Sequence, residues 1–419
     1  MNLPENGRVI VVDDKIIEEG LPLIKALSKN GVPVTFFTGI SDELPDQPLP
    51  DVRIIFLDIV LGTEGQSDKT KISTAVGVIN RLIGNDNTYA PYLIIAWTKH
   101  EELIEGIKQS LRNNPPVFIL DLEKNECKDG NGEYAIPIIE NKLKEKLKEA
   151  KVFQLFIIWE NLVHKASGKI VRDFSSFYKV DDNWNEKMSG IFYKLASAYT
   201  GRQIDDKKVT VNETIKNALL TFNGTFLDTL ENEIRSFADF DEASSIQDRS
   251  DIENKILAGI NSKLLLLIDQ FDNPEPGCVY ADENKEFTLK IDELFNGELV
   301  SFPEKDNLIQ KLKHIFIEVS PSCDYAQDKW RVHRVIRGLM WPMEYFKKIK
   351  KADYIYTSPI LEIENVVYKL VFDLRYLTSL PFEQLKGRSV MFKARHELLV
   401  DIQANIARHI NRPGVISLE

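Results

Sequence analysis

Acidic, hydroxyl and amino side chains stand at the ends of apolar runs in the first third of the chain. Asp13 and Asp14 follow "RVIVV", Asp58 follows "VRIIFL", Thr98 follows "YLIIAW", and Lys124 comes shortly after "PVFIL". Carboxylates crowded at one place repel one another unless a cation neutralises them. Hard oxygen ligands of this kind suit Mg²⁺. The residue types therefore predict a magnesium site that could serve phosphoryl transfer.

In such a reaction, Asp58 is the candidate nucleophile. Mg²⁺ held by Asp13 and Asp14 would offset the charge of the transferred group during in-line attack. The hydroxyl of Thr98 and an ammonium such as that of Lys124 could then bind the oxygens of the acyl phosphate. In isolation, however, a pair of aspartates after a strand is usually a charge pair at a helix N-terminus.

These residues need a sheet to bring them together. Five runs read as strands: 8–12, 32–37, 52–57, 92–97 and 116–120. They are continuous rather than alternating, which is typical of parallel strands buried on both faces. Helical spacing between them, in "EEGLPLIKALSKNG" and roughly over 73–84 and 100–112, predicts a doubly wound α/β domain. In a flavodoxin-like strand order the first and third strands are neighbours, so the three carboxylates would converge on one edge crevice.

The motifs "VVDD", "FLDIVLG" and "AWT", in this order on alternating strands, resemble the receiver domain of two-component response regulators. The resemblance covers the chain up to about residue 125. It implies that Asp58 accepts a phosphoryl group from a histidine kinase and that Asp13 and Asp14 hold Mg²⁺. It further implies that the backbone carbonyl of Val60 completes the protein's metal ligands and that Thr98 is the switch hydroxyl.

The sequence departs from the receiver pattern at three places. The stretch "GTEGQSDKTKIS" lengthens the loop after Asp58, and Lys99 stands where receivers usually carry a small residue. The Lys-Pro pair that receivers carry after the fifth strand is missing, and Lys124, a few residues late, is the nearest lysine. A degenerate receiver that signals by protein contacts alone is therefore an alternative.

Beyond the first domain the pattern changes twice. Long amphipathic stretches from "IIENKLKEKL" onward, then near 183–200, 210–237 and 250–271, predict helices with no strand between them. After "PEPG", strand signals at 313–320, 352–359 and 366–377 precede a final helix near 393–411. We therefore expect three regions: a receiver domain over 1–130, a helical connector or bundle over 131–274, and an α+β domain of unknown function over 275–419.

The α+β region offers one further candidate site. In "FIEVSPSCDYAQDKWRVHRVIRGL", Cys323 and His333 could act as nucleophile and base, with Asp324 beside them. The alternatives are a packed cysteine and a solvated basic strand face. A receiver-controlled effector enzyme that uses these residues is the rival interpretation of the chain.

Composition excludes several classes of protein. A net charge of −11 disfavours nucleic acid as a partner, and no run of apolar residues is long enough to cross a membrane. Three separated cysteines suit a reducing cytoplasm.

We expect a cytoplasmic signalling protein that relays phosphate to a C-terminal partner-binding region or acts as a phosphate sink. Its expected partners are a histidine kinase and a downstream effector, and a homodimer is a further alternative. The enlarged receiver and large C-terminal region resemble receiver proteins of bacterial antiphage two-component-like systems, which gives antiviral defence as a hypothesis.

Overall fold

The protein is described by a computed structural model in which two compact units can be distinguished. The first comprises Met1–Ser189 with Phe222–Gln247, and the second comprises Gly190–Thr221 with Asp248–Glu419. The predicted division into three regions stays a prediction. The structure describes residues 3, 8–84, 91–200, 210–238, 252–268, 274–282, 291–297, 299–326, 330–385 and 387–411.

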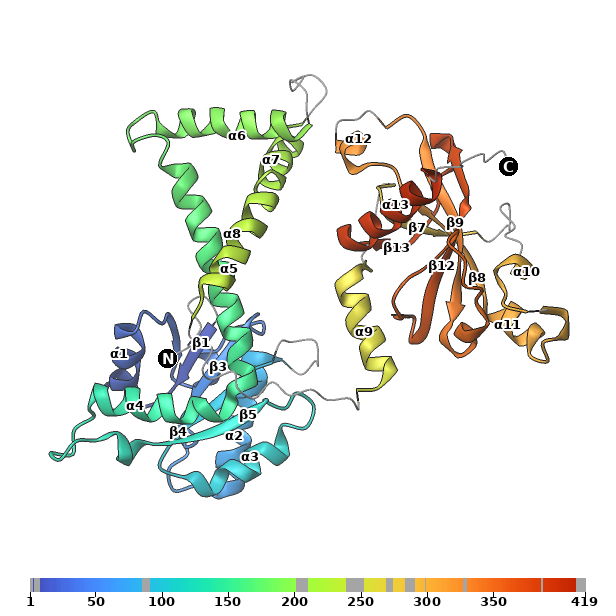
Figure 1. The fold of residues 1–419 in the computed structure, drawn as a ribbon. Coiled ribbons are helices and arrows are strands. Elements are labelled where there is room, and N and C mark those ends of the chain that lie inside the picture. The colour runs from blue at the N-terminus through green and yellow to red at the C-terminus, as the bar shows by residue number, and fades with distance from the viewer. Residues whose placement is uncertain are drawn as a thin grey trace, which may run out of the picture. The chain divides into compact units, whose positions relative to one another are not determined.

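A five-stranded parallel sheet forms the centre of the first unit (Figure 1). Its strand order is β2-β1-β3-β4-β5, with every neighbouring pair parallel, which confirms the predicted flavodoxin-like fold. Every residue of β3 and β4 is buried, as continuous apolar strands require. The strands are β1 (Arg8–Val12), β2 (Val34–Phe37), β3 (Val52–Leu57), β4 (Leu93–Thr98) and β5 (Phe118–Glu123).

Helices cover both faces of this sheet, and each face has its own hydrophobic core. Residues of α1 (Leu21–Lys29) and α4 (Ile136–Leu147) pack with one face of the sheet, and residues of α2 (Asp68–Ile83) and α3 (Ile104–Ser110) with the other. Helix α2 begins earlier than predicted because the side chain of Ser67 accepts a hydrogen bond from Thr70 N and caps it.

Short helical turns complete the connections of the first unit. One of them matters for the site: the π-helical turn η1 leads from β1 directly into α1. The turns are η1 (Ile16–Gly20), η2 (Ser41–Glu43), η3 (Glu101–Leu103), η4 (Lys124–Cys127) and η5 (Lys148–Ala150).

Helix α5 (Lys151–Ser175) takes part in two cores of the first unit. Its first turns contribute Phe153 and Ile157 to the core of the parallel sheet, and later residues pack against Leu230 of α8 (Phe222–Ser236). The α4–α5 segment thus carries the chain from the sheet into an α-helical pair, as the charged and then apolar sequence of this segment predicts.

The second unit begins with helices and continues into a sheet. Helices α6 (Trp184–Thr200) and α7 (Val211–Leu220) meet through small residues, and a capping box of Thr210 and Glu213 starts α7. The predicted helix 210–237 is divided, since Thr221 separates α7 from α8. The predicted helix 250–271 is too long: α9 (Asn254–Leu265) ends where β6 (Leu266–Leu267) pairs with β13.

The sheet of the second unit is antiparallel and forms a half-barrel, which confirms the predicted α+β class. Its strands follow the order β10-β12-β9-β8-β7-β13-β6, with β11 paired to β12. Apolar side chains of α13 (His396–Ile410) pack into its core. The strands are β7 (Cys278–Ala281), β8 (Lys313–Glu318), β9 (His333–Pro342), β10 (Ile355–Thr357), β11 (Leu361–Ile363), β12 (Val366–Leu380) and β13 (Val390–Ala394).

Short helical segments connect these strands: α10 (Ile291–Leu294), η7 (Leu299–Ser301), α11 (Lys305–Lys311), α12 (Ser322–Ala326), η8 (Met343–Lys348) and η9 (Phe382–Gln384). In the described parts of the chain, no helix combines the length and the apolar character that a membrane span requires.

A close approach between β9 and β12 gives a prediction about stability. A Cβ atom at Gly338 would lie 2.4 Å from Phe372 Cδ1 and 2.6 Å from the backbone oxygen of Val371. We expect Gly338→Ala to lower the free energy of unfolding by about 1–3 kcal/mol, as overpacking does. Gly190→Ala, where a Cβ meets nothing within 4 Å, is the matched control in the same unit. Equal stability of the two variants in urea unfolding would show that β9 and β12 can separate without cost.

Candidate functional site

The candidate site lies where the parallel strands end. Strand β5 continues to Glu123 rather than stopping at residue 120, because Thr98 at the end of β4 still pairs with it. Lys124 is therefore the first residue after the strand, and its side chain is 1% exposed. The lateness of this lysine in the sequence reflects a longer strand and not a displaced side chain.

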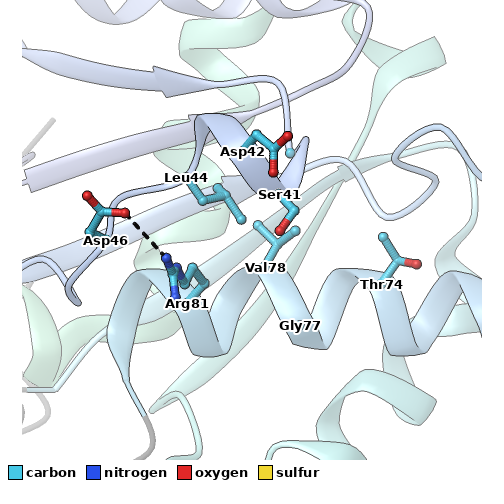
Figure 2. A pocket seen from close by; sticks show the side chains of 9 residues that line it. Ser41, Asp42, Leu44, Asp46, Thr74, Gly77, Val78 and Arg81 are labelled. Carbon is cyan, nitrogen blue, oxygen red and sulfur yellow. Dashed lines mark ion pairs between the residues drawn. The ribbon is translucent and has the colours of Figure 1, made fainter.

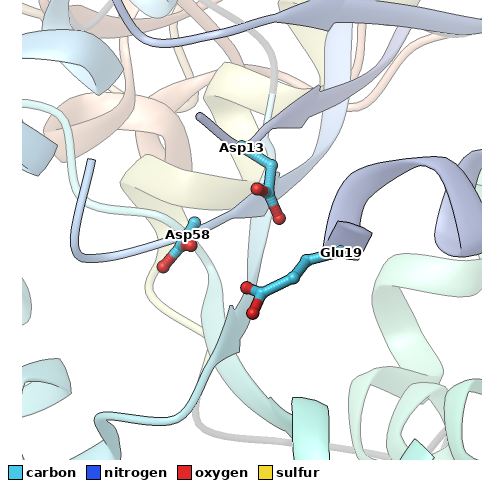
Figure 3. Close-up of side chains that lie close together, drawn as sticks. All are labelled: Asp13, Glu19 and Asp58. Atoms are coloured by element: carbon cyan, nitrogen blue, oxygen red, sulfur yellow. The ribbon is translucent and has the colours of Figure 1, made fainter. Parts of the chain in front are cut away.

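The ammonium group of Lys124 binds three carboxylates. Its Nζ donates to Asp13 Oδ2 at 3.0 Å, to Glu19 Oε2 at 2.5 Å and to Asp58 Oδ2 at 2.6 Å. An ammonium group has three hydrogens to donate, so these bonds use its full capacity. Figure 3 shows the three carboxylates pointing toward one another from separate segments.

Burial and pairing shift the pKa values of this cluster in different directions. Burial opposes the charge of Lys124, but Asp58 and Asp13 outweigh it and raise the lysine's pKa. Burial also acts on Glu19, yet hydrogen bonds from Lys124 and Lys99 lower its pKa to about 2. For Asp13, which is fully buried and lies beside Asp58, burial prevails over Lys124 and raises the pKa.

A backbone N–H group donates a hydrogen bond to each aspartate of the site. Asp13 Oδ1 accepts from Lys15 N at 2.9 Å, Asp58 Oδ1 from Val60 N at 3.1 Å, and Asp14 Oδ2 from Gly62 N at 2.9 Å. These bonds attach the aspartates to the sheet edge and its loops. Neither Asp13 nor Asp14 is the N-cap residue of the following turn, because that residue is Lys15, whose side chain makes no capping bond.

The donor set at this edge fits a divalent cation. Ligand oxygens of Asp13, Glu19 and Asp58 all lie within 4.8 Å of one another. Asp14 Oδ1 is buried and has no hydrogen-bond partner among the described residues, and a buried oxygen of this kind is satisfied by water or an ion. Buried carboxylate oxygens are what Mg²⁺ prefers. Two of the predicted ligands, Asp13 and Asp58, belong to this group. The roles of Asp14 and of the Val60 carbonyl as metal ligands stay predictions.

Thr98 and Lys99 lie beside the cluster. Thr98 is fully buried, and its Oγ1 accepts a hydrogen bond from His100 N at 3.1 Å. The side chain of Lys99 is 38% exposed, and its Nζ donates to Glu19 Oε1 at 2.6 Å. Lys99, the residue after Thr98, is thus paired with a carboxylate of the site.

Sequence reasoning missed Glu19. It comes six positions after Asp13 in "KIIEEG", and only the π-helical turn η1 directs it, rather than Glu18, toward Lys124. Nothing in the sequence distinguishes Glu19 from its neighbour Glu18, so no signal there could have found it.

The long loop after Asp58 is ordered by contacts with the site. Glu64 forms an ion pair with Lys15, which follows the two aspartates, and Thr63 is buried. The remainder of the predicted insertion becomes the first turn of α2. The loop therefore covers one side of the aspartates.

The candidate residues of the α+β region lie on separate elements. Asp324 and Cys323 belong to α12, and His333 begins β9. The side chain of Cys323 lies outside the described residues, so the pairing of Cys323 with His333 stays a prediction.

His333 itself is fully buried. Its ring lies against those of Trp330 and Phe382, with centroid distances of 4.4 and 4.7 Å, and Nδ1 is 4.0 Å from Glu318 Oε1. Burial lowers the pKa of His333 to about 4 and raises that of Glu318 to about 7. A neutral imidazole in an aromatic pocket is suited to packing, and neither ring nitrogen has a hydrogen-bond partner among the described residues.

A separate pocket of about 650 Å³ lies between η2 and α2 (Figure 2). Arg81 pairs with Asp46 at 3.7 Å on its rim, and none of the predicted site residues lines it. Its lining is Gly39, Ser41, Asp42, Leu44, Asp46, Thr74, Gly77, Val78 and Arg81.

Comparison with known proteins gives no family for this chain: no family model matches it, and no curated protein matches it significantly. The five-stranded order and the buried acidic triad are nevertheless consistent with a flavodoxin-like receiver fold.

The buried ammonium group gives a second prediction. Lys124→Met leaves Asp13 and Asp58 without their cation and Glu19 with Lys99 alone. We expect the free energy of unfolding to fall by about 3–5 kcal/mol at pH 7. The deficit should shrink as the pH falls toward 4, because unpaired buried carboxylates take up protons in the folded state and lose their charge. Urea unfolding at both pH values measures the effect.

Lys108→Met is the matched control for this experiment. Lys108 is exposed on α3, and we expect its loss to change the free energy by less than about 0.5 kcal/mol. If both variants were equally stable at pH 7, the carboxylates would not depend on Lys124.

Proposed function

We propose that the first domain is a phosphoryl-accepting receiver in which Asp58 is the acceptor. The observation that carries this proposal is the hydrogen bonding of one buried ammonium group, on Lys124, to Asp58 and Asp13 at the carboxyl ends of neighbouring strands. A nucleophile, an acidic pair and a cation stand together where ligands bind in open α/β sheets.

Phosphoryl transfer to Asp58 needs only the carboxylate of Asp58 and a phosphoryl donor. A carboxylate oxygen of Asp58 attacks phosphorus in line with the bond to the donor, which we propose is a phosphohistidine of a histidine kinase. The new bond joins Asp58 oxygen to phosphorus, the phosphorus–nitrogen bond breaks, and its electron pair stays on the imidazole nitrogen.

The surrounding residues have distinct roles in this proposal. Asp13 and Asp14, with Asp58 and the carbonyl of Val60, would hold Mg²⁺. When bound, the metal offsets negative charge on the transferred oxygens. Lys124 keeps its contact to the acceptor and then binds a phosphoryl oxygen. The hydroxyl of Thr98, whose oxygen accepts from His100 N, donates its hydrogen to another phosphoryl oxygen.

Beyond the receiver, we propose that the helical and half-barrel regions bind a downstream protein, so that the chain relays the signal or drains phosphate from its kinase. The large half-barrel with its own core supports a binding role for this region. A place in bacterial antiphage signalling is part of the same proposal and rests on the resemblance of the domain arrangement.

Acceptor chemistry at Asp58 is tested with acetyl phosphate and Mg²⁺. We expect the wild-type chain to gain the mass of one phosphoryl group and Asp58→Asn to gain none, because the amide cannot act as the nucleophile. Intact-mass measurement reports the product, and Asp42→Asn, at an exposed acid of the same domain, should behave like wild type. Unmodified wild-type protein would rule the proposal out.

Metal binding is tested independently of phosphorylation. We expect Asp14→Asn to weaken the affinity for Mg²⁺, measured by titration calorimetry, by at least about tenfold. Substitution of residues that only support the direct ligands already lowers metal affinity by about that factor. The reason for the expected loss is that Asp14 Oδ1 is buried and has no hydrogen-bond partner within the described part of the chain. Asp42→Asn is again the control, and equal affinities for all three proteins would remove Asp14 from the metal site.

A further inference from the structure

Glu19 connects the two lysines of the site. Its Oε2 accepts from Lys124 Nζ at 2.5 Å and its Oε1 from Lys99 Nζ at 2.6 Å. The residue as a whole is 9% exposed. One carboxylate thus lies between two ammonium groups that follow the ends of β4 and β5.

An acyl phosphate on Asp58 would need those same cations. Phosphoryl oxygens take charge-assisted hydrogen bonds from ammonium groups, as carboxylates do. The ammonium group of Lys124 has no hydrogen left to donate while it binds Asp13, Glu19 and Asp58. Binding a phosphoryl oxygen therefore requires one of these carboxylates to leave.

Glu19 is the carboxylate most easily exchanged. Asp58 carries the phosphoryl group and cannot leave, and Asp13 is fully buried and held by Lys15 N as well. Glu19 has the longer side chain, retains slight exposure, and stands on the single turn η1 rather than at the end of a sheet strand.

We propose that Glu19 is an internal counterion: it occupies Lys124 and Lys99 in the unphosphorylated protein and is displaced by the phosphoryl oxygens on Asp58. This inference rests on the proposed function and makes Glu19 a positioning residue for the same reaction. Lys99 accordingly becomes a second phosphoryl-binding cation, at the place where receivers usually carry a small residue.

Displacement of Glu19 would affect elements beyond the site, because the turn η1 connects Glu19 to α1. Glu19 N and Gly20 N both donate to Lys15 O within η1, and α1 starts at the next residue. At the far end of α1, Asn30 donates to Glu140 of α4 at 2.9 Å. Release of the Glu19 side chain removes the anchor of η1 and alters the start of α1, which faces α4.

The test compares Glu19→Gln with Glu18→Gln. Glutamine keeps the size of Glu19 but removes the charge that competes for the lysines. We therefore expect phosphorylation by acetyl phosphate to be about tenfold faster, which is the lower end of the rate increase that a local positive potential causes for a negatively charged substrate. Glu18 is the exposed neighbour on the same turn, and its variant should react at the wild-type rate. Hydrogen exchange over residues 16–29 should increase on phosphorylation of the wild type and be high in Glu19→Gln from the start.

A second variant keeps the test decisive if Glu19→Gln folds poorly. Glu19→Asp retains the charge but is too short to reach both ammonium groups, and we expect an intermediate rate. If wild-type protein takes up phosphate and both Glu19 variants react at the wild-type rate or more slowly, Glu19 is not the counterion, although the receiver proposal stands. If wild-type protein takes up no phosphate, the proposed function itself fails.

Discussion

One buried ammonium group and three carboxylates share the edge of the parallel sheet, and each of them is costly there without the others. A charged group removed from water must be paired and hydrogen-bonded. Lys124 meets this condition only because β5 ends beside β4, while β1 and β3 deliver Asp13 and Asp58 as neighbours. The strand order and the cluster therefore stabilise each other: a different order would leave buried charges alone.

The sequence predicted those parts of the site that depend on strands. Continuous apolar runs predict strands that are buried on both faces of a parallel sheet. Polar residues at the carboxyl ends of such strands must then meet at one edge of the sheet. Asp13, Asp58 and Lys124 were identified in this way. Glu19 could not be, because a side chain on a short turn points in a direction that the local backbone decides, and nothing in "KIIEEG" indicates a π-helical turn rather than an ordinary one.

The half-barrel was predicted less completely, for a related reason. Strands β8 and β12 carry long apolar runs that can be recognised alone. Strands β6 and β7 are short and are defined by their pairing, β6 with β13 and β7 with both β8 and β13. Glu318 and His333 illustrate the same limit. Each resembles an ordinary polar residue near a strand end, and only the packing of β8 and β9 under aromatic rings buries both.

If the first domain accepts a phosphoryl group as proposed, charge balance gives a reason for Lys99 and Glu19 to occur together. Asp13, Glu19 and Asp58 contribute three negative charges against two positive ones from Lys99 and Lys124, a net of about −1 for the cluster when the groups are ionised. A phosphoryl group replaces the single charge of Asp58 with about −2. If Glu19 stayed, the net charge would become more negative by one. If Glu19 leaves, it returns to about −1. Asp14 and a bound Mg²⁺ would contribute the same charge before and after the reaction and so do not alter this difference. In the proposed reaction, displacing Glu19 would therefore keep the charge of the site constant, and the charge that moves would be attached to η1 at the start of α1.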